Sequence, residues 1–211
     1  RLMITASGGP FRTTPIEEMD GVTPERALKH PTWSMGRKIT VDSATLMNKA
    51  FEVIESYWLF KVPWDRIEVV IHPQSIVHSM VEFADGSMKA QMGPPDMRLP
   101  IQYSLFYPTR LENPQIPRLD TGVTHDLAFQ PLDPGRYPCF DLALESGKKG
   151  GTYTAVLSAA DEVAVKLFLE RRIGFMDIYR TISAVLEDHN PSTADSLDEI
   201  LAADLWARER A

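Results

Sequence analysis

The chain has 211 residues, 44% of them hydrophobic and 24% charged, which predicts one large or two small globular domains and excludes a largely disordered chain. A formal net charge of −7 argues against a nucleic-acid or anionic-membrane partner, but leaves room for a local basic pocket that binds a small phosphate. The single cysteine, Cys139, excludes an intrachain disulfide and is interpreted as a small buried hydrophobic residue.

The first segment, LMITASGGPF (2–11), predicts an apolar strand that ends in a Gly-Gly-Pro turn. Because Arg1 precedes a strand that is already under way, we expect the chain to be a fragment or a processed product. A polar loop and a short helix are expected over residues 14–29. The turn-rich segment HPTWSMGRK (30–38) follows, and its Trp33 is compatible either with a lid that excludes water or with a place in the core.

The segment VDSATLMNKAFEVIESYW (41–58) predicts a single helix whose N-terminus is capped by Asp42 or Ser43. Apolar residues recur at helical spacing and predict a stripe that faces the core. That stripe consists of Leu46, Met47, Ala50, Val53, Ile54, Tyr57 and Trp58.

A polar stripe on the same helix brings together Asn48, Lys49 and Glu52. The first interpretation is a solvent-exposed ion pair between Lys49 and Glu52, worth about 0.3–0.5 kcal/mol. The second is a binding site, in which Ser43 and Lys49 hold an anion and Glu52 holds a hard divalent cation. Spacing alone leaves both interpretations open.

Beyond this helix, RIEVVIHP (66–73) predicts a buried strand, and residues 75–93 predict a hairpin around Ala84-Asp85-Gly86. Residues 95–108 predict a helix capped by Asp96. The Pro-rich residues 111–138 are expected to form an extended connection, and residues 139–211 contain four helix-sized segments. The predicted fold is therefore α+β: a mixed sheet with flanking helices, followed by a small C-terminal four-helix bundle.

The remaining polar segments are weaker signals. His72 is expected to be structural, and its spacing from His78 is not that of a metal site. GPPDMR (93–98) is either a rigid turn or a wall for a flat ring. AADEVAVKLFLE (159–170) and ARER (207–210) are interpreted as solvated helix faces without chemistry.

Four motifs taken together resemble the 1-deoxy-D-xylulose 5-phosphate reductoisomerase family: SGGPFR, HPTWSMGRKITVDSATLMNKAFEVIE, IHPQSIVHSMVEFADGS and GPPDMR. RYPC (136–139) and SAADEVAV (158–165) extend the resemblance into the C-terminal helices. The resemblance implies an enzyme that converts 1-deoxy-D-xylulose 5-phosphate to 2-C-methyl-D-erythritol 4-phosphate with NADPH and Mg²⁺, Mn²⁺ or Co²⁺. It also implies a homodimer in the bacterial cytoplasm or the plastid stroma.

The resemblance assigns a role to each matching residue. The catalytic residues would be Lys49, Glu52 and His30, with Glu52 the metal ligand. The substrate would be bound by Ser7, His30, Ser43, Asn48 and Lys49. Trp33 and Met35 would form the lid, and Gly36, Pro95 and Met97 would contact the nicotinamide cofactor.

Residues 1–110 would then be a catalytic domain without its N-terminal start, residues 111–138 a linker, and residues 139–211 the helical bundle. The chain lacks a GxGxxG dinucleotide motif and the family's other two metal carboxylates. We therefore expect residues 1–211 alone to be inactive. The alternative function is a non-enzymatic phosphate-binding or dimerisation module on the same fold.

Overall fold

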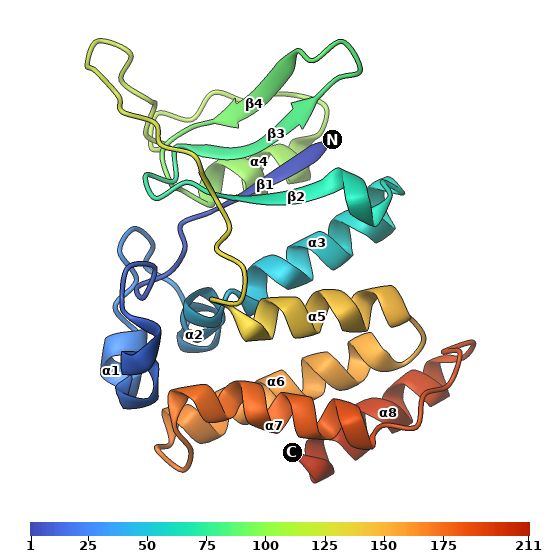
Figure 1. Ribbon diagram of the computed structural model, residues 1–211. Helices are drawn as coiled ribbons and strands as arrows, with labels where there is room; N and C mark the ends of the chain where they lie inside the picture. Colours follow the sequence, from blue (N-terminus) through green and yellow to red (C-terminus); the bar gives the residue numbers. More distant parts are fainter.

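A mixed five-stranded sheet forms one layer of the protein, and the computed structural model describes all residues 1–211 (Figure 1). The strand order is β4-β3-β1-β2-β5. The central strand β1 (Leu2–Ala6) is parallel to β2 (Ile67–Ile71) and antiparallel to β3 (Val77–Glu82). The edges are β4 (Met88–Met92) and the short β5 (Gln130–Pro131), both antiparallel to their neighbours. The predicted α+β class with a mixed sheet is confirmed.

The predicted hairpin between β3 and β4 is confirmed, and its turn shows why the sequence specifies it. Gly86 has a φ of +84°, a conformation that costs glycine little. The carboxylate of Asp85 accepts a hydrogen bond from the backbone N–H of Ser87 at 2.9 Å, and Phe83 N–H donates to Ser87 C=O at 2.9 Å. Local hydrogen bonds therefore close the turn.

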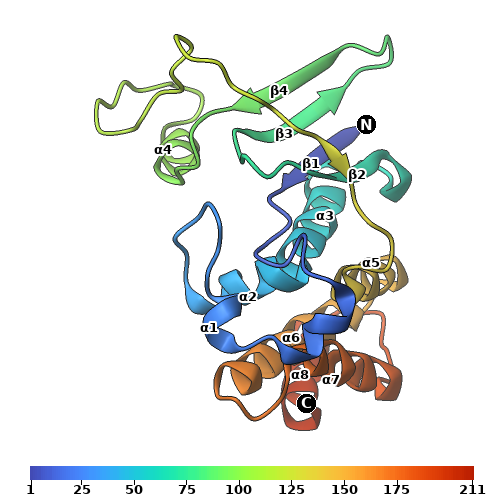
Figure 2. The same cartoon turned by 60° about the vertical axis from the view of Figure 1, so that its left-hand side comes forward.

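The helices of the first half lie mainly between the sheet and the C-terminal helices (Figure 1). They are η1 (Ile16–Gly21), α1 (Pro24–Ala27), α2 (Arg37–Thr45), α3 (Met47–Phe60), η2 (Trp64–Arg66) and α4 (Arg98–Phe106). Helix α4 is separate from the others and lies beside the sheet, on the side toward which the loop before α2 rises (Figure 2). This placement brings the loop and α4 to one side of the molecule.

Four helices follow residue 137, as predicted: α5 (Pro138–Lys149), α6 (Tyr153–Leu169), α7 (Phe175–Asp188) and α8 (Leu197–Arg210). Helix α6 packs against α5, α7 and α8, and α5 also packs against α3. One hydrophobic cluster of 32 buried residues, including Ile4 and Ile182, joins the sheet to these helices. We keep the division into residues 1–110, 111–138 and 139–211 as a proposal.

Some details of the predicted core are confirmed and one is wrong. Cys139 and His72 are buried as expected, and His72 contacts Ala128 C=O and the N–H groups of Ile76 and Val77. Trp58, predicted to face the core, is 56% exposed, since the buried stripe of α3 does not extend to its last turn. No helix has the length and apolarity that crossing a membrane requires.

Candidate functional site

A cavity of about 800 Å³ lies where the end of β1, the loop before α2, the α2–α3 junction and α4 meet. Most of the predicted site residues line it. They are Ser7, His30, Trp33, Met35, Ser43, Asn48, Lys49, Glu52 and Met97. Residues separated by up to 90 positions thus share one cavity, so the sequence prediction of a common site agrees with the geometry.

The junction between α2 and α3 corrects the prediction of one continuous helix. Leu46 has a left-handed backbone, with φ 61° and ψ 12°, so α2 ends at Thr45 and α3 begins at Met47. Ser43 is therefore buried in the last turns of α2 rather than capping a helix. The left-handed conformation costs a non-glycine residue about 1–2 kcal/mol, which the burial of the Leu46 side chain, 1% exposed, helps to offset.

The break gives the cavity a helix N-terminus. Asn48 and Lys49 occupy the first turn of α3, where the positive end of the helix dipole favours an anion, although the Lys49 N–H already donates to Leu46 C=O at 3.1 Å. Ser43 lines the same cavity from α2. An anion here would therefore meet a hydroxyl, an ammonium and a helix terminus, which is the donor set that a phosphate prefers.

Lys49 and Glu52 form the ion pair that the spacing predicted, but not on a freely solvated face. Lys49 Nζ lies 3.0 and 2.8 Å from the two carboxylate oxygens of Glu52. The Lys49 side chain is only 12% exposed, whereas that of Glu52 is 43% exposed. Beside them, the buried Asn48 Oδ1 has no hydrogen-bond partner. An unpartnered buried oxygen indicates a place for a ligand donor or a cation.

The loop that begins at His30 is tied to the end of β1. His30 Nδ1 accepts hydrogen bonds from the N–H groups of Thr32 at 3.1 Å and Trp33 at 2.8 Å, so the ring proton resides on Nε2. Nε2–H then donates to Ser7 Oγ at 3.0 Å, and Ser7 Oγ also accepts from Gly9 N–H. Partial burial lowers the pKa of His30, which favours this neutral form. The Ser7 hydroxyl proton is left to donate into the cavity.

The sequence was compatible with Trp33 in a lid or in the core, and its observed position is intermediate between these. Its side chain is half-buried and lines the cavity instead of joining the hydrophobic core. The ring stands edge-on to His78, with 6.2 Å between the ring centroids. This contact connects the loop to β3 across the cavity, which is the place that a lid would occupy.

Two of the residues expected to contact a cofactor lie outside the cavity lining. Met97, at the start of α4, lines the cavity and is 56% exposed, but Pro95 does not line it and Pro94 does. Gly36 is the N-cap of α2 and faces a neighbouring depression instead. The interpretation of GPPDMR as a wall for a flat ring therefore rests on Pro94 and Met97.

The Gly-Gly turn serves the cavity through close packing. Gly8 and Gly9 both have positive φ, +83° and +67°. A Cβ on Gly9 would lie 2.5 Å from the backbone oxygen of Ser43. Only glycine lets the end of β1 approach α2 this closely.

Sequence reasoning missed several residues that line the cavity. His78 Nε2 lies 3.1 Å from Gly93 C=O, and its alternation on β3 was the signal that could have placed it on the cavity side. Ser75, with φ 52°, and Arg110, whose guanidinium lies 4.1 Å above the Tyr103 ring, carry no recognisable spacing. They reach the cavity through loop geometry.

The donor set for a metal is incomplete in this chain. The chain has no cluster of three or more His, Cys, Asp or Glu side chains in metal-binding arrangement. Glu52 and Asp96 are the carboxylates that line the cavity, but Asp96 is paired with Arg98, and Asn48 Oδ1 is the free oxygen beside Glu52. These oxygens suit a hard divalent cation but supply only part of its usual six ligands.

Two protein-family models match this chain, and both describe the C-terminal domain of an enzyme. Residues 1–60 match "1-deoxy-D-xylulose 5-phosphate reductoisomerase C-terminal domain", and residues 92–210 match "DXP reductoisomerase C-terminal domain". This chain belongs to the 1-deoxy-D-xylulose 5-phosphate reductoisomerase family.

Relatives and solved structures agree with this assignment. The reductoisomerases of Chlorobium phaeobacteroides (strain DSM 266) and Heliobacterium modesticaldum are 56% and 57% identical over 211 and 208 residues, which is 100% and 99% of this chain. The chain covers only 55% and 53% of those proteins, so it spans about half their length.

The Zymomonas mobilis enzyme in complex with NADPH superimposes on the whole chain with a TM-score of 0.91 at 48% identity, over 54% of its own chain. A reductoisomerase in complex with NADPH, fosmidomycin and magnesium superimposes on 99% of the chain with a TM-score of 0.93 at 38% identity, over 53% of its own chain.

Proposed function

We propose that this chain is the substrate-binding and C-terminal part of a 1-deoxy-D-xylulose 5-phosphate reductoisomerase, an enzyme of isoprenoid precursor synthesis by the non-mevalonate route. The whole enzyme would convert this substrate to 2-C-methyl-D-erythritol 4-phosphate with NADPH and a divalent cation. The observation that carries the proposal is the junction at Leu46, which gathers Ser43, Asn48, Lys49 and Glu52 in one cavity.

The substrate phosphate would lie at the N-terminus of α3. Lys49 would supply a positive charge, Ser43 a hydroxyl donor, and Asn48 its amide group. Ser7, whose oxygen already accepts from His30, would donate its proton to the ligand. Clamping a non-reacting phosphate orients the carbon skeleton, since binding energy remote from the reacting atoms reduces the entropy cost at those atoms.

Glu52 would be this chain's ligand to the divalent cation, with Asn48 Oδ1 as an adjacent oxygen. Glu52 would then exchange part of its contact with Lys49, so that the Lys49 ammonium becomes free for the phosphate. A bound divalent cation would stabilise the negative charge that develops on the carbonyl and hydroxyl oxygens of the substrate. Glu52 would thus bind the cation and Lys49 the phosphate once ligand binding breaks their ion pair.

The nicotinamide of NADPH would lie against Met97, with Met35 on the lid side. Gly36 and Pro95 would act behind these residues, because neither lines the cavity. Closure of the His30–Gly36 loop, with Trp33 above the ligand, would exclude water during hydride transfer. His30 would hold the Ser7 hydroxyl in its donating orientation.

Residues 1–211 alone would not turn over substrate, since the chain has no group of three metal-ligating side chains and no dinucleotide motif. The alternative function of this chain, a non-enzymatic phosphate-binding or dimerisation module, would also use the cavity. Turnover by the complete native protein separates the two functions. Full-rate NADPH oxidation by the 211 residues alone would contradict the prediction that they are inactive.

The test uses the complete native protein with 1-deoxy-D-xylulose 5-phosphate, NADPH and Mg²⁺. We expect NADPH oxidation and formation of 2-C-methyl-D-erythritol 4-phosphate. Lys49→Ala should weaken substrate binding roughly 10- to 150-fold, because a charge-assisted hydrogen bond contributes about 1.5–3 kcal/mol. Lys148→Ala, on an exposed position of α5 outside the cavity, is the matched control and should bind as the unmodified protein does. Unchanged affinity in Lys49→Ala would refute the phosphate role.

We also infer that the protein is a homodimer, in the bacterial cytoplasm or the plastid stroma. Strand β4 supports the dimer, because it forms an edge of the sheet and all five of its residues are exposed, including Met88 and Met92. An exposed apolar edge strand is a surface on which a second copy can continue the sheet. Sedimentation of the complete protein at the mass of one chain would contradict the dimer.

A further inference from the structure

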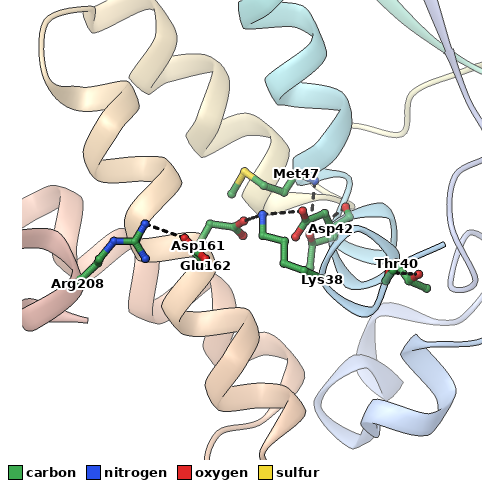
Figure 3. A network of polar contacts seen from close by, with 9 residues as sticks. Lys38, Thr40, Asp42, Met47, Asp161, Glu162 and Arg208 are labelled. Atoms are coloured by element: carbon green, nitrogen blue, oxygen red, sulfur yellow. Dashed lines mark hydrogen bonds and ion pairs between the residues drawn. The ribbon is translucent and has the colours of Figure 1, made fainter. Parts of the chain in front are cut away.

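A buried ionic cluster connects α2 to the C-terminal helices, on a side of α2 that does not line the substrate cavity. Lys38 Nζ lies 2.7 Å from Asp42 Oδ2 and 2.5 Å from Asp161 Oδ2 (Figure 3). Lys38 and Asp42 are one turn apart on α2, and Asp161 is on α6. The interpretation of residues 159–170 as a solvated face is therefore wrong at Asp161, because packing of α6 against α2 covers it.

The two carboxylates are deeply buried and incompletely paired. The side chains of Asp42 and Asp161 are 3% and 0% exposed, whereas that of Lys38 is 40% exposed. One oxygen of each carboxylate, Oδ1 in both cases, has no hydrogen-bond partner. A single ammonium cannot compensate two buried negative charges, so an unprotonated cluster would leave one charge unpaired. One proton shared by the two carboxyl groups removes that charge.

The surroundings support the shared proton. Burial raises the pKa of Asp42 to about 7 and also raises the pKa of Asp161. The neighbouring titratable groups are Glu162 on α6, which adds negative charge, Cys139 on α5, whose thiol has a pKa raised by burial, and Glu52 and Glu55 on α3, which line one depression with Lys38 and Asp42. The ring of Phe51 on α3 lies 5.4 Å from Lys38 Nζ. Lys38 is thus the cation that pairs with both carboxylates.

The cluster lies next to two parts of the substrate site. Lys38 follows Gly36, the N-cap of α2 and the last residue of the lid loop, by two positions, and no side chain caps this helix. Asp42 immediately precedes Ser43, which lines the cavity. A shift of α2 relative to α6 would therefore move the end of the lid and the Ser43 hydroxyl together.

We propose that Asp161 is a positioning residue of the substrate site: through Lys38 and Asp42 it fixes α2, and with it Ser43 and the end of the lid, without contacting the substrate. The inference rests on the proposed function for the identity of the substrate. It assigns to the C-terminal helices a part in substrate affinity. The shared proton makes the anchor strongest when the cluster is neutral and weakest when both carboxylates are charged.

The test compares Asp161→Ala, Asp161→Asn and the control Glu162→Gln in the complete native protein. Glu162 lies beside Asp161, is 58% exposed and pairs with Arg208 at 2.7 Å, so its variant removes the same charge outside the cluster. Asp161→Ala should raise KM for 1-deoxy-D-xylulose 5-phosphate on the order of tenfold with little change in kcat. Asp161→Asn should restore KM, because its amide can accept from Lys38 and donate to Asp42. Glu162→Gln should leave KM unchanged.

The pH profile separates positioning from simple folding. In the unmodified protein KM should rise as the pH increases through about 7, where the second carboxyl group ionises, and in Asp161→Asn this step should be missing. The comparison holds even if Asp161→Ala does not fold. Identical profiles in the two proteins, or a folded Asp161→Ala with unchanged KM, would overturn the proposal.

A second measurement does not depend on the substrate. The chain has four tryptophans, and 5-fluorotryptophan labelling reports the lid through Trp33 by ¹⁹F NMR. Asp161→Ala should shift the Trp33 resonance while Glu162→Gln should not, and an unmoved resonance would count against the anchor. If the lid responds but the unmodified protein does not bind 1-deoxy-D-xylulose 5-phosphate, the proposed function fails and the positioning role stands.

Discussion

Replacement of Gly9 by alanine should damage the proposed substrate site through the backbone alone. The added Cβ would lie 2.5 Å from the Ser43 carbonyl oxygen and 3.1 Å from the Ala44 Cα, both fixed parts of α2. Gly8, the adjacent residue, provides the matched control. Its φ is also positive, but the three atoms nearest to its Cβ all belong to the flexible side chain of Arg12.

The two variants share one cost and differ in another. A left-handed backbone costs a non-glycine residue about 1–2 kcal/mol, and both variants incur it. Overpacking against a fixed neighbour typically adds about 1–3 kcal/mol, and only Gly9→Ala incurs that. We therefore expect losses in the free energy of unfolding of roughly 2–5 kcal/mol for Gly9→Ala and roughly 1–2 kcal/mol for Gly8→Ala.

Urea unfolding of the complete native protein measures both losses, and isothermal titration with 1-deoxy-D-xylulose 5-phosphate measures the site. Gly9→Ala should bind the substrate more weakly, because relief of the clash displaces α2 and with it Ser43. Gly8→Ala should retain its affinity. Equal stabilities in the two variants would refute the argument that Gly9 is needed for close approach to α2.

Three further predictions concern single side chains. Asp42 has a folded-state pKa near 7 against 3.8 for an unperturbed carboxyl, so its contribution to stability is complete below about pH 4 and is lost as the pH rises toward 7. Relative to the unmodified protein, Asp42→Asn should therefore gain up to roughly 4 kcal/mol in the free energy of unfolding across that range, because one pKa unit corresponds to about 1.36 kcal/mol. A stability difference in urea unfolding that does not change with pH would contradict this. His72→Ala should cost roughly 3 kcal/mol or more in the same assay, because it removes a fully buried ring and leaves two backbone N–H groups unpaired. Trp33→Ala should raise KM yet change the free energy of unfolding by less than about 1 kcal/mol, and a large stability loss would show that Trp33 packs as a core residue.

Local signals in the sequence were sufficient for much of the fold. The hairpin around Gly86 and the four C-terminal helices follow from turn chemistry and helical periodicity, which depend on neighbouring residues only. The pairing of β5 with β2 was not predictable, since residues 130 and 131 carry no strand pattern and Pro131 argues against one. Such pairings are decided by where the long connection crosses the sheet.

The helix break was hidden for a related reason. Leu46 fits the apolar stripe of one continuous helix, and neither glycine nor proline marks the junction. The side chain is buried in either arrangement, so periodicity cannot distinguish them. The motifs could place Ser43 and Lys49 in one site, but not show that they belong to different helices with an N-terminus between them.

The burial of Asp161 could not be predicted from the charge pattern of its own helix. Next to Glu162 and within an amphipathic segment, it has the sequence context of an exposed acid, and its burial depends on Lys38, 123 residues away. Because burying a carboxylate without compensation is costly, the chain must bring a cation to it when α6 packs on α2. Folding of the C-terminal helices and placement of α2 are for this reason linked, so the proposed substrate cavity and the helices behind it form one energetic unit.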